Sequence, residues 1–369
     1  MKRSTASTLL ALAPLLAVVR AQQTCNSTSL CGADAPCCSE FGFCSADFCG
    51  AGCNPLFSNT VDSCNPIPIC EDKTYTFPTL DVIANATTFN GNVSLADWTL
   101  DKGDLSLTNE NEVAFILTET NGGTRISSTR YVHYGTITAT MKTGKWDGVV
   151  TAFITMSDVH DEIDWEWPGK ASTLEGQSNY FWLGVVNRDS RGSAAHGDKH
   201  NITSDASSNY HDYTIDWQED ELRFLIDGQE VRSIKKSDTK DSKTSVFEYP
   251  TTPARVQFSL WPAGINGSAQ GTIDWSGGNI NFQDPDYIAA GHFYALLKSV
   301  KVECAKTGAA ATKVGDVSYV YGANASGVPT VFSSNESAVS AATAVVVSGM
   351  RAIGPLVAAF AIAVSALML

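Results

Sequence analysis

Basic side chains are scarce in this sequence of 369 residues: 25 Lys and Arg stand against 39 Asp and Glu, a formal net charge of −14. Nucleic-acid binding depends on clustered positive charge, so this balance argues against DNA or RNA as a partner. Cysteine is scarce over most of the chain, because only Cys304 lies outside the segment from Cys25 to Cys70. No long amphipathic helical pattern is found between about residues 75 and 303, and no internal repeat is found.

Both ends of the chain carry long apolar runs of the kind found in processing signals. Residues 1–21 begin with Lys2 and Arg3, continue into an apolar stretch and end in small residues, Val19 and Ala21. This pattern predicts a secretory signal peptide cleaved after Ala21, and its apolar stretch is too short for a stable membrane span.

Residues 352–369 are almost wholly apolar, and no basic residue follows them. Small residues rich in Ser, Ala and Thr precede this run, so the pattern resembles a GPI-attachment signal whose tail is removed. The alternative is a single membrane span. We expect residues 305–351 to form a stalk that includes the attachment region. Seven N-x-S/T sequons fit an extracellular glycoprotein, at Asn26, Asn85, Asn92, Asn201, Asn266, Asn324 and Asn335.

The dense cysteines near the N-terminus predict a disulfide scaffold. So short a segment cannot build a large apolar core, and a secreted chain allows disulfides to form. Zinc ligation is the disfavoured alternative, since it needs isolated cysteine pairs in a reducing compartment. Residues 54–74 contain three prolines and are expected to be a linker.

From residue 75 to residue 304 the sequence is typical of a β protein. Short alternating runs such as YTIDWQ (213–218), LRFLID (222–227) and VQFSLW (256–261) are separated by Gly, Asn, Asp and Pro. About 230 residues of this kind suit one all-β domain, and we predict a two-sheet jelly-roll sandwich.

One short stretch, HDEIDWEWPG at residues 160–169, combines acidic and aromatic residues in alternation. On a strand its carboxylates project from one face and its large apolar side chains from the other. Burial of the apolar face in the sandwich leaves the carboxylates together, where mutual repulsion raises the pKa of at least one of them. Paired carboxylates of this kind suit glycoside chemistry; a solvated acidic edge and a calcium site are the alternatives. The carboxylates are Glu162, Asp164 and Glu166, and the apolar residues are Ile163, Trp165 and Trp167.

Residues 25–53, CNSTSLCGADAPCCSEFGFCSADFCGAGC, resemble the hevein-like chitin-binding module. The resemblance implies the disulfides Cys25–Cys38, Cys31–Cys44 and Cys37–Cys49. We further expect Cys53–Cys64 and Cys70–Cys304. In that family one serine and three aromatic rings bind N-acetylglucosamine, and here the aromatic positions are all Phe, without polar groups. The matching positions are Ser39, Phe41, Phe43 and Phe48.

The stretch DEIDWEW is similar to the E-x-D-x-E signature of glycoside hydrolase family 16. Further matches, among them QSNYFWLG, GTIDWSGG and LKSVKVE, extend over most of residues 85–303 and most resemble the Crh-type transglycosylases of fungal cell walls. The resemblance implies that Glu162 is the nucleophile, Glu166 the general acid/base and Asp164 the assisting carboxylate.

The same resemblance places sugar-binding candidates around this trio. Trp261, Trp275, Gln177 and Asn179 match family positions in or beside the cleft. Where bacterial glucanases of the family often have Glu and Arg, this chain has Thr138 and Thr140, and these smaller side chains would make room in the cleft for a 2-acetamido group. No metal ion or other cofactor is expected.

The resemblance therefore implies a retaining transglycosylase that cleaves chitin and transfers it to β-glucan or chitin. The alternatives are a hydrolase that uses the same carboxylates and a non-catalytic chitin-binding wall protein. The expected partners are chitin and β-glucan, with no nucleic acid. The expected location is the cell wall and the outer face of the plasma membrane, where a GPI anchor holds a monomer. Because the sandwich is expected to hold the cleft, the module should be dispensable on soluble oligosaccharides.

Overall fold

The computed structural model describes residues 23–169, 172–185, 196–305, 315–322 and 328–337. The expected signal peptide and C-terminal tail lie outside these residues. Within them, no helix is long and apolar enough to cross a membrane.

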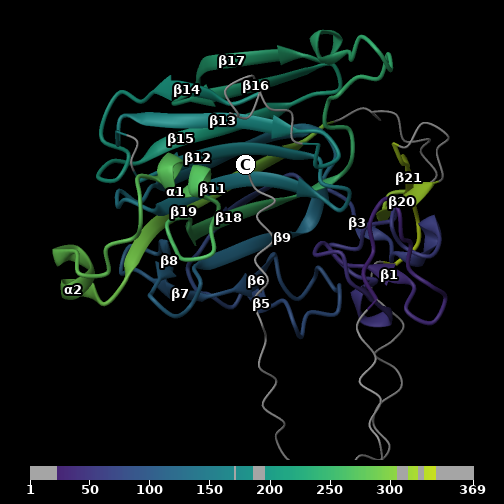
Figure 1. Ribbon diagram of the computed structural model, residues 1–369, viewed down its shortest axis with the longest axis horizontal. Coiled ribbons are helices and arrows are strands. Elements are labelled where there is room, and N and C mark those ends of the chain that lie inside the picture. Colours follow the sequence, from purple (N-terminus) through teal and green to yellow (C-terminus); the bar gives the residue numbers. More distant parts are fainter. Residues whose placement is uncertain (1–22, 170–171, 186–195, 306–314, 323–327, 338–369) are drawn as a thin grey trace, which may run out of the picture.

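Two large, mainly antiparallel sheets pack face to face (Figure 1) and confirm the predicted all-β sandwich. The back sheet has the order β17 (Gln229–Lys235), β16 (Glu221–Ile226), β15 (His211–Trp217), β10 (Gly135–Lys142), β19 (Phe293–Cys304), β8 (Val113–Leu117) and β7 (Asp104–Leu107), and β4 (Lys73–Thr76) also pairs with β19. The front sheet has the order β14 (Asp198–Asn201), β13 (Glu175–Phe181), β12 (Glu162–Pro168), β11 (Val149–Ser157), β18 (Ala254–Pro262), β9 (Thr124–Val132), β6 (Trp98–Lys102) and β5 (Ile83–Asn85).

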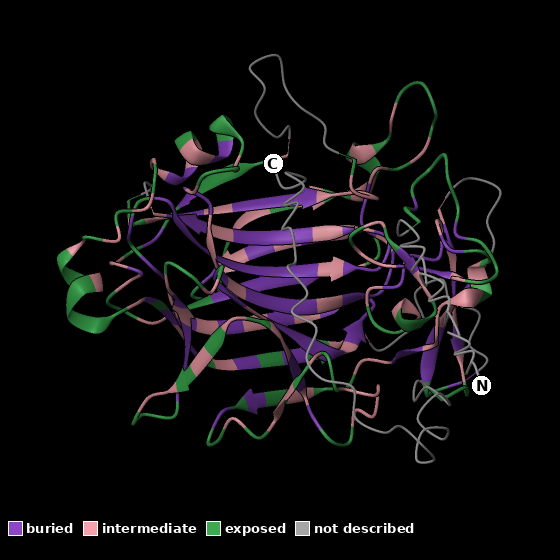
Figure 2. Cartoon of the chain, turned by 60° about the horizontal axis from the view of Figure 1, so that its bottom comes forward, coloured by how far each residue is buried: buried purple, intermediate pink, exposed green. Residues whose placement is uncertain are grey.

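The core lies between these sheets because their strands alternate buried apolar side chains with polar ones. On β10, Ile137, Ala139 and Met141 are buried, and the threonines between them face outward. Figure 2 shows burial along the middle of the strands and exposure in the loops and at the edges. Two short helices, α1 (Gln270–Ser276) and α2 (Pro285–Ala290), lie between β18 and β19 in the sequence.

A small disulfide-rich unit precedes the sandwich. It contains β1 (Cys37–Cys38), β2 (Cys44–Ser45) and the 3-10 helices η1 (Ala46–Phe48) and η2 (Val61–Ser63). All ten cysteines are paired, in agreement with the expected pairing: Cys25–Cys38, Cys31–Cys44, Cys37–Cys49, Cys53–Cys64 and Cys70–Cys304.

The expected linker and stalk contain structure that the sequence interpretation omitted. A third sheet joins β3 (Ile67–Pro68) to β20 (Ser318–Gly322) and β21 (Thr330–Ser334). Its strands form because they bury apolar side chains together: Tyr319, Tyr321 and Val331 pack with Ile67 and with Tyr131 of β9. Over these residues the chain is therefore not an unstructured linker or stalk.

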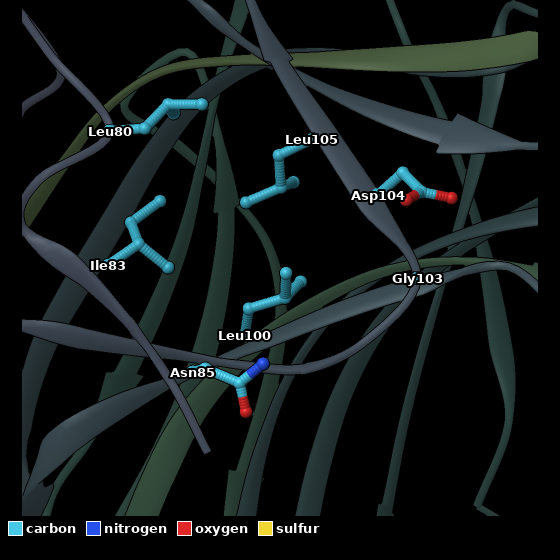
Figure 3. Close-up of a pocket in the computed structure, with 7 residues that line it drawn as sticks. All are labelled: Leu80, Ile83, Asn85, Leu100, Gly103, Asp104 and Leu105. Atoms are coloured by element: carbon cyan, nitrogen blue, oxygen red, sulfur yellow. The ribbon is translucent and has the colours of Figure 1, made fainter. Parts of the chain in front are cut away.

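One cavity, of about 330 Å³, lies between the two sheets at the edge formed by β5, β6 and β7 (Figure 3). Several strands separate it from β12 in the front sheet. It is therefore distinct from the acidic stretch. The lining residues are Leu80, Ile83, Asn85, Leu100, Gly103, Asp104 and Leu105.

Candidate active site

The acidic stretch forms β12, whose alternation separates the two kinds of side chain as predicted. Ile163, Trp165 and Trp167 are buried in the core. The Trp165 indole N–H donates to the carbonyl oxygen of Thr214 in the back sheet, at 3.2 Å. The burial of both indoles confirms that these tryptophans pack the core and leaves no ring face open to a sugar.

The three carboxylates face away from the core on the open side of the front sheet. Glu162 and Glu166 remain partly accessible to solvent, whereas Asp164 between them is only 2% exposed. Strand pairing places Gln177 opposite Glu166 and Asn179 opposite Asp164 on β13. The front sheet therefore gathers both candidate glutamates and two of the polar candidates on one face.

Burial raises the pKa of all three carboxyls. The pKa of Glu162 is raised to about 7 and that of Glu166 to about 8, in both cases mainly through desolvation. For Asp164, desolvation acts together with the charges of both glutamates, and its pKa lies well above the usual range. The trio therefore retains protons near neutral pH that ordinary carboxyls release.

A hydrogen bond between Asp164 and Glu162 divides the roles within the trio. The bond lowers the pKa of Glu162 and raises that of Asp164, which favours the proton on Asp164 and the charge on Glu162. Glu166 feels the Glu162 charge, which adds to desolvation in keeping it protonated. One ionised and one protonated carboxyl on neighbouring positions are what a nucleophile and an acid require.

Two tryptophans stand beside Glu166. The Trp261 side chain hydrogen-bonds to Glu166, and its ring stacks on Trp275 with centroids 6.1 Å apart. The Trp275 indole N–H donates in turn to Oε1 of Gln177, at 2.9 Å. The structure thus connects Trp261, Trp275 and Gln177 to the Glu166 end of the trio, where apolar rings can stack on sugar faces.

Asn179 makes a different contact. It is 8% exposed, and its Oδ1 accepts the backbone N–H of Tyr180 at 3.0 Å. It lies opposite Asp164, but its side-chain oxygen is engaged by the backbone of its own strand.

The two threonines expected to widen the donor site lie elsewhere. Thr138 and Thr140 project from the outer face of β10 in the back sheet, where they hydrogen-bond to Thr214 and Asp212 of β15. The core separates them from the trio, so the hypothesis that they accommodate an acetamido group is wrong. Strand alternation alone does not say which sheet a strand joins.

The sequence interpretation missed a polar network on the same face as the trio. Arg125 of β9 donates from Nε to Oδ2 of Asp101 at 3.0 Å, and Ser127 also donates to this carboxylate. Gln257 and Ser259 of β18 lie between this network and β12. Alternation within VQFSLW was the available signal, since it puts Gln257, Ser259 and Trp261 on one face.

The sugar-binding candidates of the N-terminal module lie on its surface. Phe41 is 71% exposed and Phe43 is 37% exposed, and Phe48 is half-buried. The Ser39 hydroxyl accepts the backbone N–H of Phe43 at 3.2 Å. Two of the three rings are thus open to a ligand.

Comparison with known proteins shows the family to which the chain belongs. Residues 92–277 match the model of glycosyl hydrolases family 16. Crh-like protein 3 of Botryotinia fuckeliana is 37% identical over 350 residues, which cover 94% of this chain and 74% of that protein. Congo red hypersensitive protein 2 of Saccharomyces cerevisiae is 38% identical over 305 residues, which cover 82% of this chain and 64% of that protein.

Among solved structures, the Crh5 transglycosylase in complex with NAG is similar, with a TM-score of 0.58 and 26% identity. The match covers 76% of this chain and 98% of that one. Sandwich and carboxylate row together define a carbohydrate-active enzyme. The chain belongs to glycosyl hydrolases family 16, among its Crh-like proteins.

Proposed function

We propose that this chain is a retaining transglycosylase of the cell wall, which cleaves chitin and transfers it to β-glucan or to another chitin chain. The observation that carries the proposal is the shared open face of β12, where Glu162, Asp164 and Glu166 lie in a row and burial raises the pKa of each carboxyl. The similarity to Crh-like proteins and to a Crh5 transglycosylase supports the choice of substrate and reaction.

In the first step, a carboxylate oxygen of Glu162 attacks the anomeric carbon of the donor. The bond from that carbon to the glycosidic oxygen breaks, and Glu166 gives its proton to the departing oxygen. Asp164 orients Glu162 through their hydrogen bond, and the indole of Trp261 holds Glu166. The donor is left as an ester on Glu162, with its anomeric configuration inverted.

In the second step, Glu166 removes the proton from an acceptor hydroxyl, whose oxygen attacks the same carbon. The ester bond breaks, Glu162 regains its charge, and the second inversion restores the β-configuration. Water competes with the sugar acceptor at this point, so transfer requires that an acceptor be bound with its hydroxyl near Glu166. Trp261 and Trp275 are the proposed acceptor platform, with Gln177 and Asn179 as polar neighbours.

The test is incubation of the chain with chitin oligosaccharides and a labelled glucan oligosaccharide, followed by sizing of the products. Transfer predicts labelled products longer than the added glucan, with β-linkages, in increasing amount as acceptor is added. Products that only shorten at every acceptor concentration would replace the transglycosylase by a hydrolase using the same carboxylates.

We further propose that the chain acts outside the cell as a monomer held by a GPI anchor attached within residues 305–351. The signal-like N-terminus and the apolar C-terminal run support this location. Release from intact cells by a GPI-specific phospholipase tests it; retention on the cells would favour a membrane span.

A further inference from the structure

The N-terminal module is fastened to the sandwich at several points. Gly52 donates its backbone N–H to Oδ1 of Asp158, at 3.1 Å, and Tyr131 of β9 donates its hydroxyl to the same oxygen at 2.9 Å. The ring of His160, two residues before Glu162, hydrogen-bonds to the backbone of Glu40. The module is therefore seated on the sandwich and is not carried on a free tether.

A further contact between the module and the sandwich lies on the open face of the front sheet. Oε1 of Glu40 lies 3.0 Å from Nη2 of Arg125, and both side chains are mostly shielded from solvent. Arg125 lies in the same cross-strand row as Glu166, through Ala152 of β11 and Ser259 of β18. Three steps between neighbouring strands amount to about 14 Å.

The direction of this row matters for a bound sugar chain. Glu162 and Glu166 are separated along β12 and must flank the bond that is broken. A polysaccharide that passes between them crosses the strands, and on the side of β11, β18 and β9 it runs toward Arg125. Glu40 belongs to the loop 39–43, which carries three of the four sugar-binding candidates of the module.

The module covers neither the trio nor its own aromatic rings. Glu162 and Glu166 stay partly accessible, and Phe41 is 71% exposed although its neighbour Glu40 is held against the sandwich. A module that blocked the cleft would bury either the two glutamates or the ring of Phe41.

We propose that the sandwich cleft and the loop 39–43 form one continuous binding site for a single chain of β-linked N-acetylglucosamine units, which contacts the trio at one end and Phe41 at the other. Glu40 and Arg125 join the two parts and offer polar groups to the hydroxyls and acetamides of the chain. This inference rests on the proposed function for the identity of the sugar. It replaces the expectation that the module is dispensable on soluble oligosaccharides.

The experiment measures binding in a Glu162→Gln background, which cannot form the glycosyl ester. Affinities for a chitin disaccharide and a chitin hexasaccharide are compared by calorimetry. A continuous site predicts that the hexasaccharide gains affinity by reaching the module. Phe41→Ala should reduce that gain roughly fivefold, as expected for loss of one ring–sugar stack. Glu40→Gln should reduce it too, by releasing the loop from Arg125.

Matched controls come from the same module. Leu30→Ala removes another exposed apolar side chain, and Asp34→Asn removes another exposed carboxylate; both should keep the full gain. If all four variants keep the same gain in affinity of the hexasaccharide over the disaccharide, the cleft and the module are two independent sites. If Glu40→Gln increases this gain in affinity, the module obstructs the cleft. Because no turnover is involved, failure of the transfer reaction leaves this measurement intact, and loss of the length effect leaves the transfer test intact.

Discussion

We propose that Asp164 acts in this site as a hydrogen-bond donor more than as a charge. It lies buried between two glutamates, and their charges together with desolvation hold its pKa well above the usual range. An amide in its place can still donate to Glu162 but cannot be ionised. The nearness of Asp164 to Glu162 therefore matters more than its acidity.

The first prediction concerns the roles within the trio. Glu162→Gln and Glu166→Gln should each lower kcat by about a thousandfold or more, because each proposed step uses both groups. Asp164→Asn should retain measurable activity. Rates on chitin oligosaccharides, with circular dichroism as a folding control, test this. Near wild-type rates in all three variants would remove the trio from the mechanism.

The second prediction concerns pH and stability. Burial raises the pKa of Glu166 from 4.5 to about 8, so between these values the folded chain binds more protons than the unfolded chain. This group's contribution is fully present below pH 4.5 and is lost as pH rises toward 8. At pH 8 the free energy of unfolding of Glu166→Gln should therefore exceed that of wild type by about 1–2 kcal/mol, which raises its Tm; at pH 4 the two should unfold at similar temperatures. A difference that does not change with pH would contradict the buried-charge explanation.

Sequence alone was sufficient to place the three carboxylates on one face of a strand, because strict alternation fixes which side chains share a face. It misplaced Thr138 and Thr140, since their alternation is equally regular but belongs to the back sheet. Arg125 was missed because its position opposite Ser259 depends on pairing between strands far apart in the sequence.

At the scale of elements, β20 and β21 stand out because they follow the sandwich yet pack on it. Their apolar side chains close a small core with Ile67 and Tyr131. Low charge and a content of Ala, Ser and Thr suggested a stalk, and composition alone did not reveal the few alternating Tyr and Val residues. The long strands of the sandwich were predictable because each carries a longer alternating run.

The third prediction tests this pairing by truncation. A chain that ends at Ala305 should have a lower Tm than one that ends at Ser337, because it exposes Tyr131 and Ile67. A loss of about 1–3 kcal/mol is expected for removal of a few buried side chains from a small cluster. The longer chain is the control. Equal Tm values would show that β20 and β21 add nothing to the stability of the sandwich.

At the scale of the whole molecule, the module and the third sheet both contact the sandwich. Neither the position of the module nor its contact through Glu40 follows from the sequence, since both depend on surfaces formed only after each part has folded. The module's internal disulfides were predictable from its family resemblance. The contacts of the module with Asp158 and Arg125 were not predictable.

The fourth prediction follows from these contacts between the module and the sandwich. Calorimetry of a chain covering residues 23–337 should give a single unfolding transition, because the two parts stabilise each other. Asp158→Ala, which removes the acceptor of both Gly52 and Tyr131, should separate or broaden the transition. Asp104→Ala, at the far edge of the sandwich, is the control. Two separate transitions in the unaltered chain would contradict a fixed module.

The bond between Cys70 and Cys304 also sets the path of mechanical force. It joins the chain just before β4 to the last residue of β19, across a sequence separation of 234 residues. A pull between the module and the C-terminal segment passes through this bond, so the sandwich strands between the two cysteines are largely spared the tension. Stretching a single molecule should release roughly 800 Å of contour length only after a reductant has opened the bond.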